Sequence, residues 1–140
     1  MAFAKVCLDL TEKGYEISVP TSHHLPYDLI AKKGRTFILL QIKYSGDGYV
    51  RNKKRAGSGL RVNYADGDFD YYAIYNPIVD RCIYPSFKYG GSLIRFEQKN
   101  YTGPYLWWED FLDFKEHVEK RTSSIIIPTI DDIKQLNLNL

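Results

Sequence analysis

The chain has 140 residues, 44% of them hydrophobic, and a net charge of +2. This length fits one domain with its own core. No apolar stretch approaches the roughly 18 residues of a membrane span, and so small a net charge does not by itself imply a nucleic-acid partner. The only cysteines, Cys7 and Cys82, follow no metal or disulfide pattern. We therefore expect both to be reduced, buried and structural in a soluble intracellular protein.

The chain opens with a predicted helix over residues 2–13, because apolar residues recur on one face and Gly14 follows. Residues 15–19 alternate between polar and apolar side chains, which predicts a strand. A polar turn then carries His23 and His24. Surface histidines are the simpler interpretation of this pair, and the alternative places them beside a reacting group.

Two further strands are predicted over residues 27–31 and 36–43, joined by a short turn. The second is apolar until Gln41 and Lys43 appear near its end. Side chains two apart in a strand share a face, so the hairpin brings Asp28, Gln41 and Lys43 around one point. The simpler alternative is that Asp28 begins a strand and Lys43 ends one at a solvent-exposed edge.

Residues 44–66 are rich in glycine, serine, asparagine and basic side chains, and are too long for an ordinary connection. Short strand patterns at residues 49–50 and 60–64 predict an extended β-ribbon, the kind of element that fits the DNA major groove. Tyr64 adds a further polar group. The alternative is a solvated, flexible loop. The candidate DNA contacts are Tyr49, Arg51, Asn52, Lys53, Lys54, Arg55 and Arg61.

Strands are predicted next over residues 69–75, 81–84 and 92–97. Aromatic and apolar residues at helical spacing predict a helix over residues 107–121, and Thr129 caps a last helix that continues to Gln135. The order of these elements predicts an α+β fold with a mixed sheet. We expect one domain over residues 1–140: a core over about 1–98, which includes the ribbon at 44–66, and a helical part over 105–140.

The first half of the chain resembles the PD-(D/E)XK nuclease superfamily, and most of all the small branch encoded within group I introns, the cyanobacterial type of homing endonuclease. The matching strings are Gly14-Tyr15, Pro20, Tyr27-Asp28-Leu29, Gln41-Ile42-Lys43 and Asp70-Tyr71-Tyr72. The resemblance implies a restriction-endonuclease-like core with a mixed central sheet flanked by helices. It also implies a site-specific endonuclease that cuts double-stranded DNA with Mg²⁺, for which Mn²⁺ can substitute.

By this resemblance, Asp28, Gln41 and the Ile42 carbonyl hold the metal, while Asp28, Gln41 and Lys43 form the catalytic set. Two features depart from the family pattern. Gln41 stands where most members have an acid. The glutamate usual on the first helix would by its spacing fall near or before Met1, so the chain either lacks it or starts downstream of it, and Asp9 and Glu12 come late in that helix.

The same resemblance implies a pseudo-palindromic double-stranded DNA target and a homodimer or homotetramer, without a membrane partner. It places the protein in a bacterial cytoplasm with the nucleoid, or in an organelle. Two other functions stay open: a structure-specific nuclease for junctions or repair, and a DNA-binding module without catalysis. Gln41 and the absent helix acid motivate the last of these.

Overall fold

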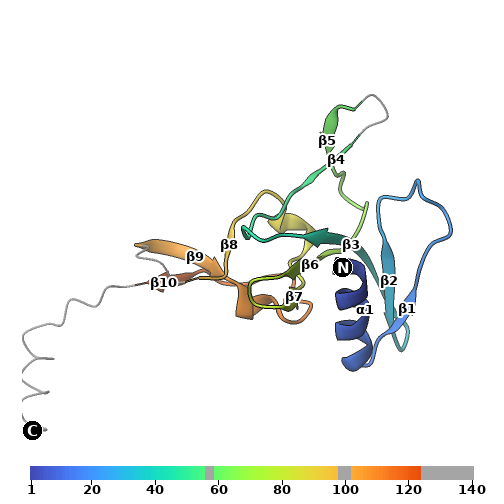
Figure 1. Cartoon of the computed structure of the whole chain (residues 1–140), viewed down its shortest axis with the longest axis horizontal. Helices are drawn as coiled ribbons and strands as arrows, with labels where there is room; N and C mark the ends of the chain where they lie inside the picture. Colours follow the sequence, from blue (N-terminus) through green and yellow to red (C-terminus); the bar gives the residue numbers. More distant parts are fainter. Residues whose placement is uncertain (56–58, 98–101, 124–140) are drawn as a thin grey trace, which may run out of the picture.

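The computed structural model describes residues 1–55, 59–97 and 102–123. One α-helix, α1 (Ala2–Glu12), packs on a five-stranded sheet in the order β1-β2-β3-β6-β7 (Figure 1). The strands of this core sheet are β1 (Glu16–Ser18), β2 (Leu29–Lys33), β3 (Thr36–Tyr44), β6 (Tyr71–Asn76) and β7 (Arg81–Ile83).

The core sheet is mixed, because β3 pairs in parallel with β6 while the other neighbouring strands pair antiparallel. A two-residue loop joins β2 to β3, and Gly34 opens it with a φ of +61°, a conformation that favours glycine. Together with α1, this arrangement confirms the predicted α+β fold with a mixed central sheet.

Two hydrophobic clusters cover the two faces of the core sheet. On one face, Val6 and Leu10 of α1 pack with Leu40 of β3. On the other face, Tyr72 and Ile74 of β6 pack with residues from the C-terminal half of the described chain. Because side chains alternate along a strand, Gln41 and Lys43 belong to this second face, away from α1.

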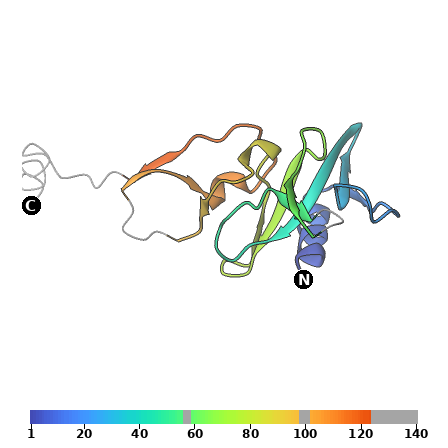
Figure 2. The same cartoon turned by 90° about the horizontal axis from the view of Figure 1, so that it is seen from above.

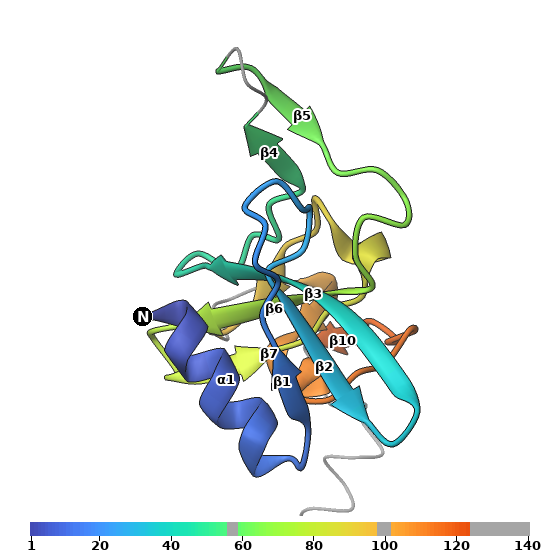
Figure 3. The same ribbon diagram turned by 90° about the vertical axis from the view of Figure 1, so that its right-hand side faces the viewer.

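A separate ribbon of two strands, β4 (Lys53–Arg55) and β5 (Arg61–Asn63), projects from the core (Figure 3). The predicted ribbon is therefore present over a shorter range. Its expected first piece at residues 49–50 lies elsewhere, since Tyr49 pairs with Leu93 and the Val50 N–H donates to the Ser92 carbonyl.

A three-stranded sheet covers part of the second face and extends away from α1 (Figure 2). Its strands follow the order β10-β9-β8, and two 3₁₀ helices lie beside them. The elements are η1 (Phe87–Tyr89), β8 (Ile94–Arg95), β9 (Gly103–Trp107), η2 (Trp108–Phe111) and β10 (Arg121–Ser123).

The helix predicted over residues 107–121 is wrong, and so is the helical part expected from residue 105 as far as the structure describes it. The aromatic residues of this segment serve both faces of the core sheet: Phe111 packs in the second cluster, whereas Phe114 packs against the first. One stripe of an α-helix cannot reach both. In the described residues α1 is the one α-helix beside the core sheet, and the helix predicted near residue 130 lies outside them.

Cys82 is buried, as predicted, but Cys7 is only partly buried. Burial raises the pKa of both thiols, that of Cys82 to about 12. Neither is in a disulfide. No helix in the described part of the chain is long and apolar enough to cross a membrane.

Candidate active site

Asp28 lies immediately before β2, at a point where β3 continues past the end of its neighbour. Leu29 pairs with Leu40, so residues 41–44 of β3 have no β2 partner. The Asp28 N–H donates to the Leu40 carbonyl at 2.8 Å, and Asp28 Oδ2 accepts the Ile42 N–H at 3.0 Å. The aspartate thus continues the strand pairing with its side chain, which fixes its carboxylate against β3.

This arrangement gathers several oxygen atoms that suit a hard cation. Asp28 is exposed, and its Oδ1 accepts no hydrogen bond from the described residues. A strand residue directs its N–H and C=O to the same edge, so the Ile42 carbonyl points to the side where Asp28 lies. Gln41 is half-buried at the position before Ile42, on the same sheet face as Lys43, and carries an amide oxygen that a hard cation could use.

The donor set fits Mg²⁺, which takes oxygen ligands and keeps several waters or phosphate oxygens of its own. It is poor in carboxylates, however. Among the described residues, no three His, Cys, Asp or Glu side chains come together as a metal cluster. A divalent ion would therefore rely on Asp28 for charge, and on bound phosphate for the rest.

Lys43 is half-buried on the same sheet face, and its Nζ donates to the Tyr64 hydroxyl at 3.0 Å. Burial lowers the pKa of Lys43, the nearby charge of Asp28 acts in the opposite direction, and Arg51 and Arg61 lower it further. A lysine in this setting holds a proton less firmly than a lysine in water. It can neutralise negative charge at a phosphate or assist proton transfer from water.

Tyr64 belongs to this site more closely than its sequence position indicated. It is half-buried, and burial, followed by the charges of Asp28 and Asp68, raises its pKa to about 12. The hydroxyl is therefore protonated at physiological pH. Tyr64 comes directly after β5, where the ribbon returns to the core, and this return is a tertiary contact that no local sequence pattern indicates.

Lys43 and Tyr64 line a groove of about 460 Å³ at the base of the ribbon. The structure thus brings most of the predicted DNA contacts into one groove with the candidate catalytic lysine. The side chain of Arg55 lies outside the described residues. The predicted contacts that line the groove are Tyr49, Arg51, Asn52, Lys53, Lys54 and Arg61.

Arg51 is held by an acid from its own loop. Its two terminal nitrogens donate to the carboxylate of Asp47 at 2.7 and 3.1 Å, and Asp47 also accepts the Tyr49 N–H and the Ser45 hydroxyl. The guanidinium holds the pKa of Asp47 well below its usual range. Arg51 therefore borders the groove in a fixed orientation, with part of its donor capacity already used.

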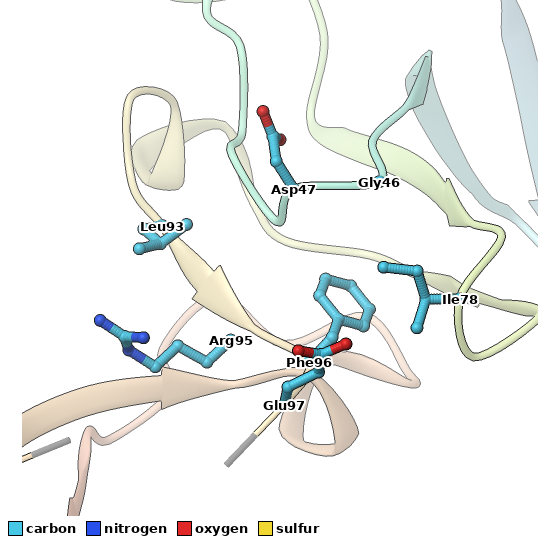
Figure 4. Close-up of a pocket in the computed structure, with 7 residues that line it drawn as sticks. All are labelled: Gly46, Asp47, Ile78, Leu93, Arg95, Phe96 and Glu97. Carbon is cyan, nitrogen blue, oxygen red and sulfur yellow. The ribbon is translucent and has the colours of Figure 1, made fainter. Parts of the chain in front are cut away.

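A smaller pocket, of about 270 Å³, has Asp47 among its lining residues (Figure 4). It is bordered by the Gly46–Asp47 turn and by residues of β8 and the segment after it, with Arg95 and Glu97 as its other charged side chains. None of the candidate catalytic residues lines it.

The acids of α1 do not reach the candidate site. Asp9 accepts a hydrogen bond from the Tyr84 hydroxyl and pairs with Lys13 at 3.1 Å, on the sheet face that α1 covers. Glu12 is exposed near the end of the helix. His23 and His24 are exposed in the turn before Asp28. Among the described residues, neither imidazole ring is hydrogen-bonded to Asp28 or Lys43.

Comparison with known proteins decides the family. The sequence profile described as PD-(D/E)XK endonuclease matches residues 1–101. The chain belongs to this family. The matched range contains α1, the core sheet and the ribbon, so it includes every residue of the candidate site. No curated protein sequence matches the chain.

The fold of this PD-(D/E)XK endonuclease is also that of a solved structure, the bacterial homing endonuclease I-Ssp6803I. The two structures superpose with a TM-score of 0.61 over 74% of this chain and 79% of that one, at 19% sequence identity. At this identity the likeness shows a shared restriction-endonuclease-like fold. It is consistent with the resemblance inferred from the sequence strings.

Proposed function

We propose that the protein is a site-specific double-strand DNA endonuclease of the homing type, which hydrolyses phosphodiester bonds with Mg²⁺ or Mn²⁺. One observation carries the proposal: the carboxylate of Asp28 is fixed on the Ile42 backbone close to Lys43, and Lys43 lines a basic groove at the base of a projecting ribbon. The family match supports the endonuclease class, and the groove supports DNA as the substrate.

In this proposal the residues divide the work by their chemistry. Asp28, the Gln41 amide oxygen and the Ile42 carbonyl hold the divalent ion, which when bound polarises the phosphate and makes water a stronger nucleophile. Lys43 orients the attacking water and offsets the negative charge that develops at phosphorus. The water oxygen bonds to phosphorus as the bond to the leaving sugar oxygen breaks. The attacking water releases one proton to the solvent, and the leaving sugar oxygen takes up a proton from a solvent water.

The ribbon provides the sequence preference in this proposal. The major groove of DNA is about 12 Å wide and admits a two-stranded ribbon. In the protein, Lys53, Lys54 and Arg61 of the ribbon line the surface groove that also contains Lys43. Some of these charges contact phosphates and only position the duplex. Cutting both strands requires two sites, so we propose a homodimer or homotetramer on a pseudo-palindromic target, in the nucleoid-containing cytoplasm of a bacterium.

Cleavage of a linear duplex that carries an intron insertion site tests the proposal. We expect discrete double-strand cuts that require Mg²⁺ and form much more slowly in Asp28→Ala and Lys43→Ala. Full activity in either variant would refute the site assignment. A four-way junction of unrelated sequence serves as the comparison substrate, because its preferential cleavage would indicate a structure-specific junction or repair nuclease.

A second candidate function is a DNA-binding module without catalysis. The neutral side chain of Gln41 and the single carboxylate of the donor set favour it, since they weaken attraction for a cation. Tight binding of duplex DNA without cleavage across a range of Mg²⁺ and Mn²⁺ concentrations would support this candidate over the endonuclease.

A further inference from the structure

Tyr64 closes the base of the ribbon. It comes directly after β5, and its N–H donates to the Asn52 carbonyl at 3.0 Å, next to the first residue of β4. Lys54 of β4 lies over its ring at 5.8 Å from the centroid and pairs with Asp68 at 3.6 Å. The position of Tyr64 is therefore tied to the position of the ribbon.

The ring of Tyr64 is also anchored to the core. It meets Phe69 edge to face, with 4.9 Å between centroids and 85° between planes. Phe69 is itself only 2% exposed and packs edge to face on Tyr72 in the second hydrophobic cluster. The tyrosine hydroxyl is thus held by a ring that the core keeps in place.

The hydroxyl at the end of this ring accepts a hydrogen bond from Lys43 Nζ at 3.0 Å. It is the one hydrogen-bond partner of this ammonium group among the described residues. The same ammonium group lies 5.0 Å from the centroid of the Tyr64 ring. A lysine side chain is long and flexible, so these two contacts with one tyrosine decide where its charge lies, and the hydroxyl supplies the directional one. The Asp28 carboxylate lies near enough to influence the same ammonium group.

From these contacts we infer that Tyr64 is a positioning residue: it holds the Lys43 ammonium at the reacting phosphate, in a place set by the seating of the ribbon on the core. The inference rests on the proposed nuclease function, and it adds a group outside the Asp28, Gln41 and Lys43 set. Misplacement of a reacting group by about 1 Å can cost up to roughly a hundredfold in rate, so loss of this contact reduces chemistry even where the duplex still binds.

Tyr64→Phe isolates the hydroxyl, because it keeps the ring on Phe69 and removes only the acceptor. With a saturating duplex and Mg²⁺, we expect the single-turnover cleavage rate to fall roughly tenfold, while the Kd for the same duplex, measured with Ca²⁺ in place of Mg²⁺, changes less than about twofold. A purely structural role would instead weaken DNA binding and cleavage together.

Tyr44→Phe is the matched control. Tyr44 is the next residue of β3 and its ring lies 6.1 Å from that of Tyr75, a residue packed on the α1 side. We expect this variant to cleave at the wild-type rate. A wild-type rate in Tyr64→Phe would overturn the inference, and so would a loss of DNA binding that accounts for the whole fall in rate. A wild-type protein that cuts no duplex refutes the proposed function and the inference with it.

A double-mutant cycle of stability measures the hydrogen bond between Lys43 and Tyr64 independently of cleavage activity. Urea unfolding is followed for the wild type, Lys43→Met, Tyr64→Phe and the double variant. We expect the two single shifts of the midpoint to be larger in sum than the shift of the double variant, because each single change removes the same hydrogen bond. Additive shifts would overturn the inference, whatever the cleavage rates.

Discussion

At each edge of β3, an aspartate side chain accepts a hydrogen bond from a backbone N–H of the strand, but the surroundings of the two aspartates differ. At one edge, Asp28 Oδ2 accepts the Ile42 N–H, and at the other, Asp70 Oδ2 accepts the Leu39 N–H at 2.8 Å. The backbone of Asp70 is also hydrogen-bonded: its N–H donates to the Leu39 carbonyl, and its carbonyl accepts the Phe87 N–H. At the Asp28 edge, by contrast, β2 ends and Lys43 lies close by.

This contrast teaches that a carboxylate bonded to a strand backbone is not by itself a site. At the Asp70 edge the bond completes the junction between β3 and β6, and both aspartates are exposed. What distinguishes the Asp28 edge is that β3 continues beyond its pairing with β2, and that the Asp28 carboxylate there lies near enough to influence the Lys43 ammonium group. The contrast is open to direct tests.

The largest expected effect separates the two aspartates themselves. Asp28→Asn keeps an acceptor for the Ile42 N–H but removes the negative charge, so we expect the rate of Mg²⁺-dependent cleavage to fall about a thousandfold. Asp70→Asn is the matched variant at the other edge, and its rate should stay within about threefold of the wild type. Single-turnover cleavage measures both. Equal losses in the two variants would abolish the contrast.

Removal of the ammonium group from the Asp28 edge should have the next largest effect. We expect Lys43→Met to slow cleavage about a hundredfold, because a positioned charge or proton carrier contributes at least that much. DNA binding in Ca²⁺ should change little, since other basic side chains line the same groove. Lys32→Met, on a strand outside the groove, controls for loss of a lysine. An active Lys43→Met would remove the lysine from the mechanism.

Addition of an acid to the Asp28 edge sharpens the comparison further. Gln41→Glu gives the donor set a second carboxylate, so the Mg²⁺ concentration that gives half-maximal cleavage should fall about tenfold. Gln41→Asn keeps the amide and is the neutral control. Titration of cleavage with Mg²⁺ measures the change. An unchanged metal requirement in Gln41→Glu would mean that residue 41 does not contact the ion.

The smallest expected effect lies at the Asp70 edge and concerns stability. Asp70→Ala removes the acceptor of the Leu39 N–H, so we expect the free energy of unfolding to fall by about 1 kcal/mol, with cleavage retained in the remaining folded protein. Urea unfolding measures the difference. A variant of normal stability that no longer cuts DNA would show that Asp70 takes part in the reaction.

Much of the core sheet and of the candidate site was accessible from the sequence, for a physical reason. The short loop at Gly34 fixes the hairpin register, and the register decides which residues of β3 extend beyond the end of β2. Apolar strands that carry two polar side chains near one end are uncommon in a buried sheet. These local rules predict, before any tertiary contact is known, that Asp28, Gln41 and Lys43 lie close together.

The rest depends on contacts between distant parts of the chain. Tyr64 meets Lys43 only because the ribbon folds back, and nothing local in the sequence indicates that return. The aromatic spacing of Phe111 and Phe114 matches an α-helix, but these side chains fill clusters on opposite faces of the core sheet. Tertiary packing therefore overrides the local period in this segment.

The parallel pairing of β3 with β6 has a consequence for how such a protein diversifies. Parallel neighbours require a long crossover, which is usually a helix, and here the ribbon occupies that crossover. Insertions and deletions there change the length of a connection that the parallel pairing requires in any case, and substitutions leave its length unchanged. The entropy of loop closure changes slowly with length. Under the proposed function, a lineage can therefore acquire new recognition sequences by remodelling this one surface connection, while the strand register on either side is inherited intact.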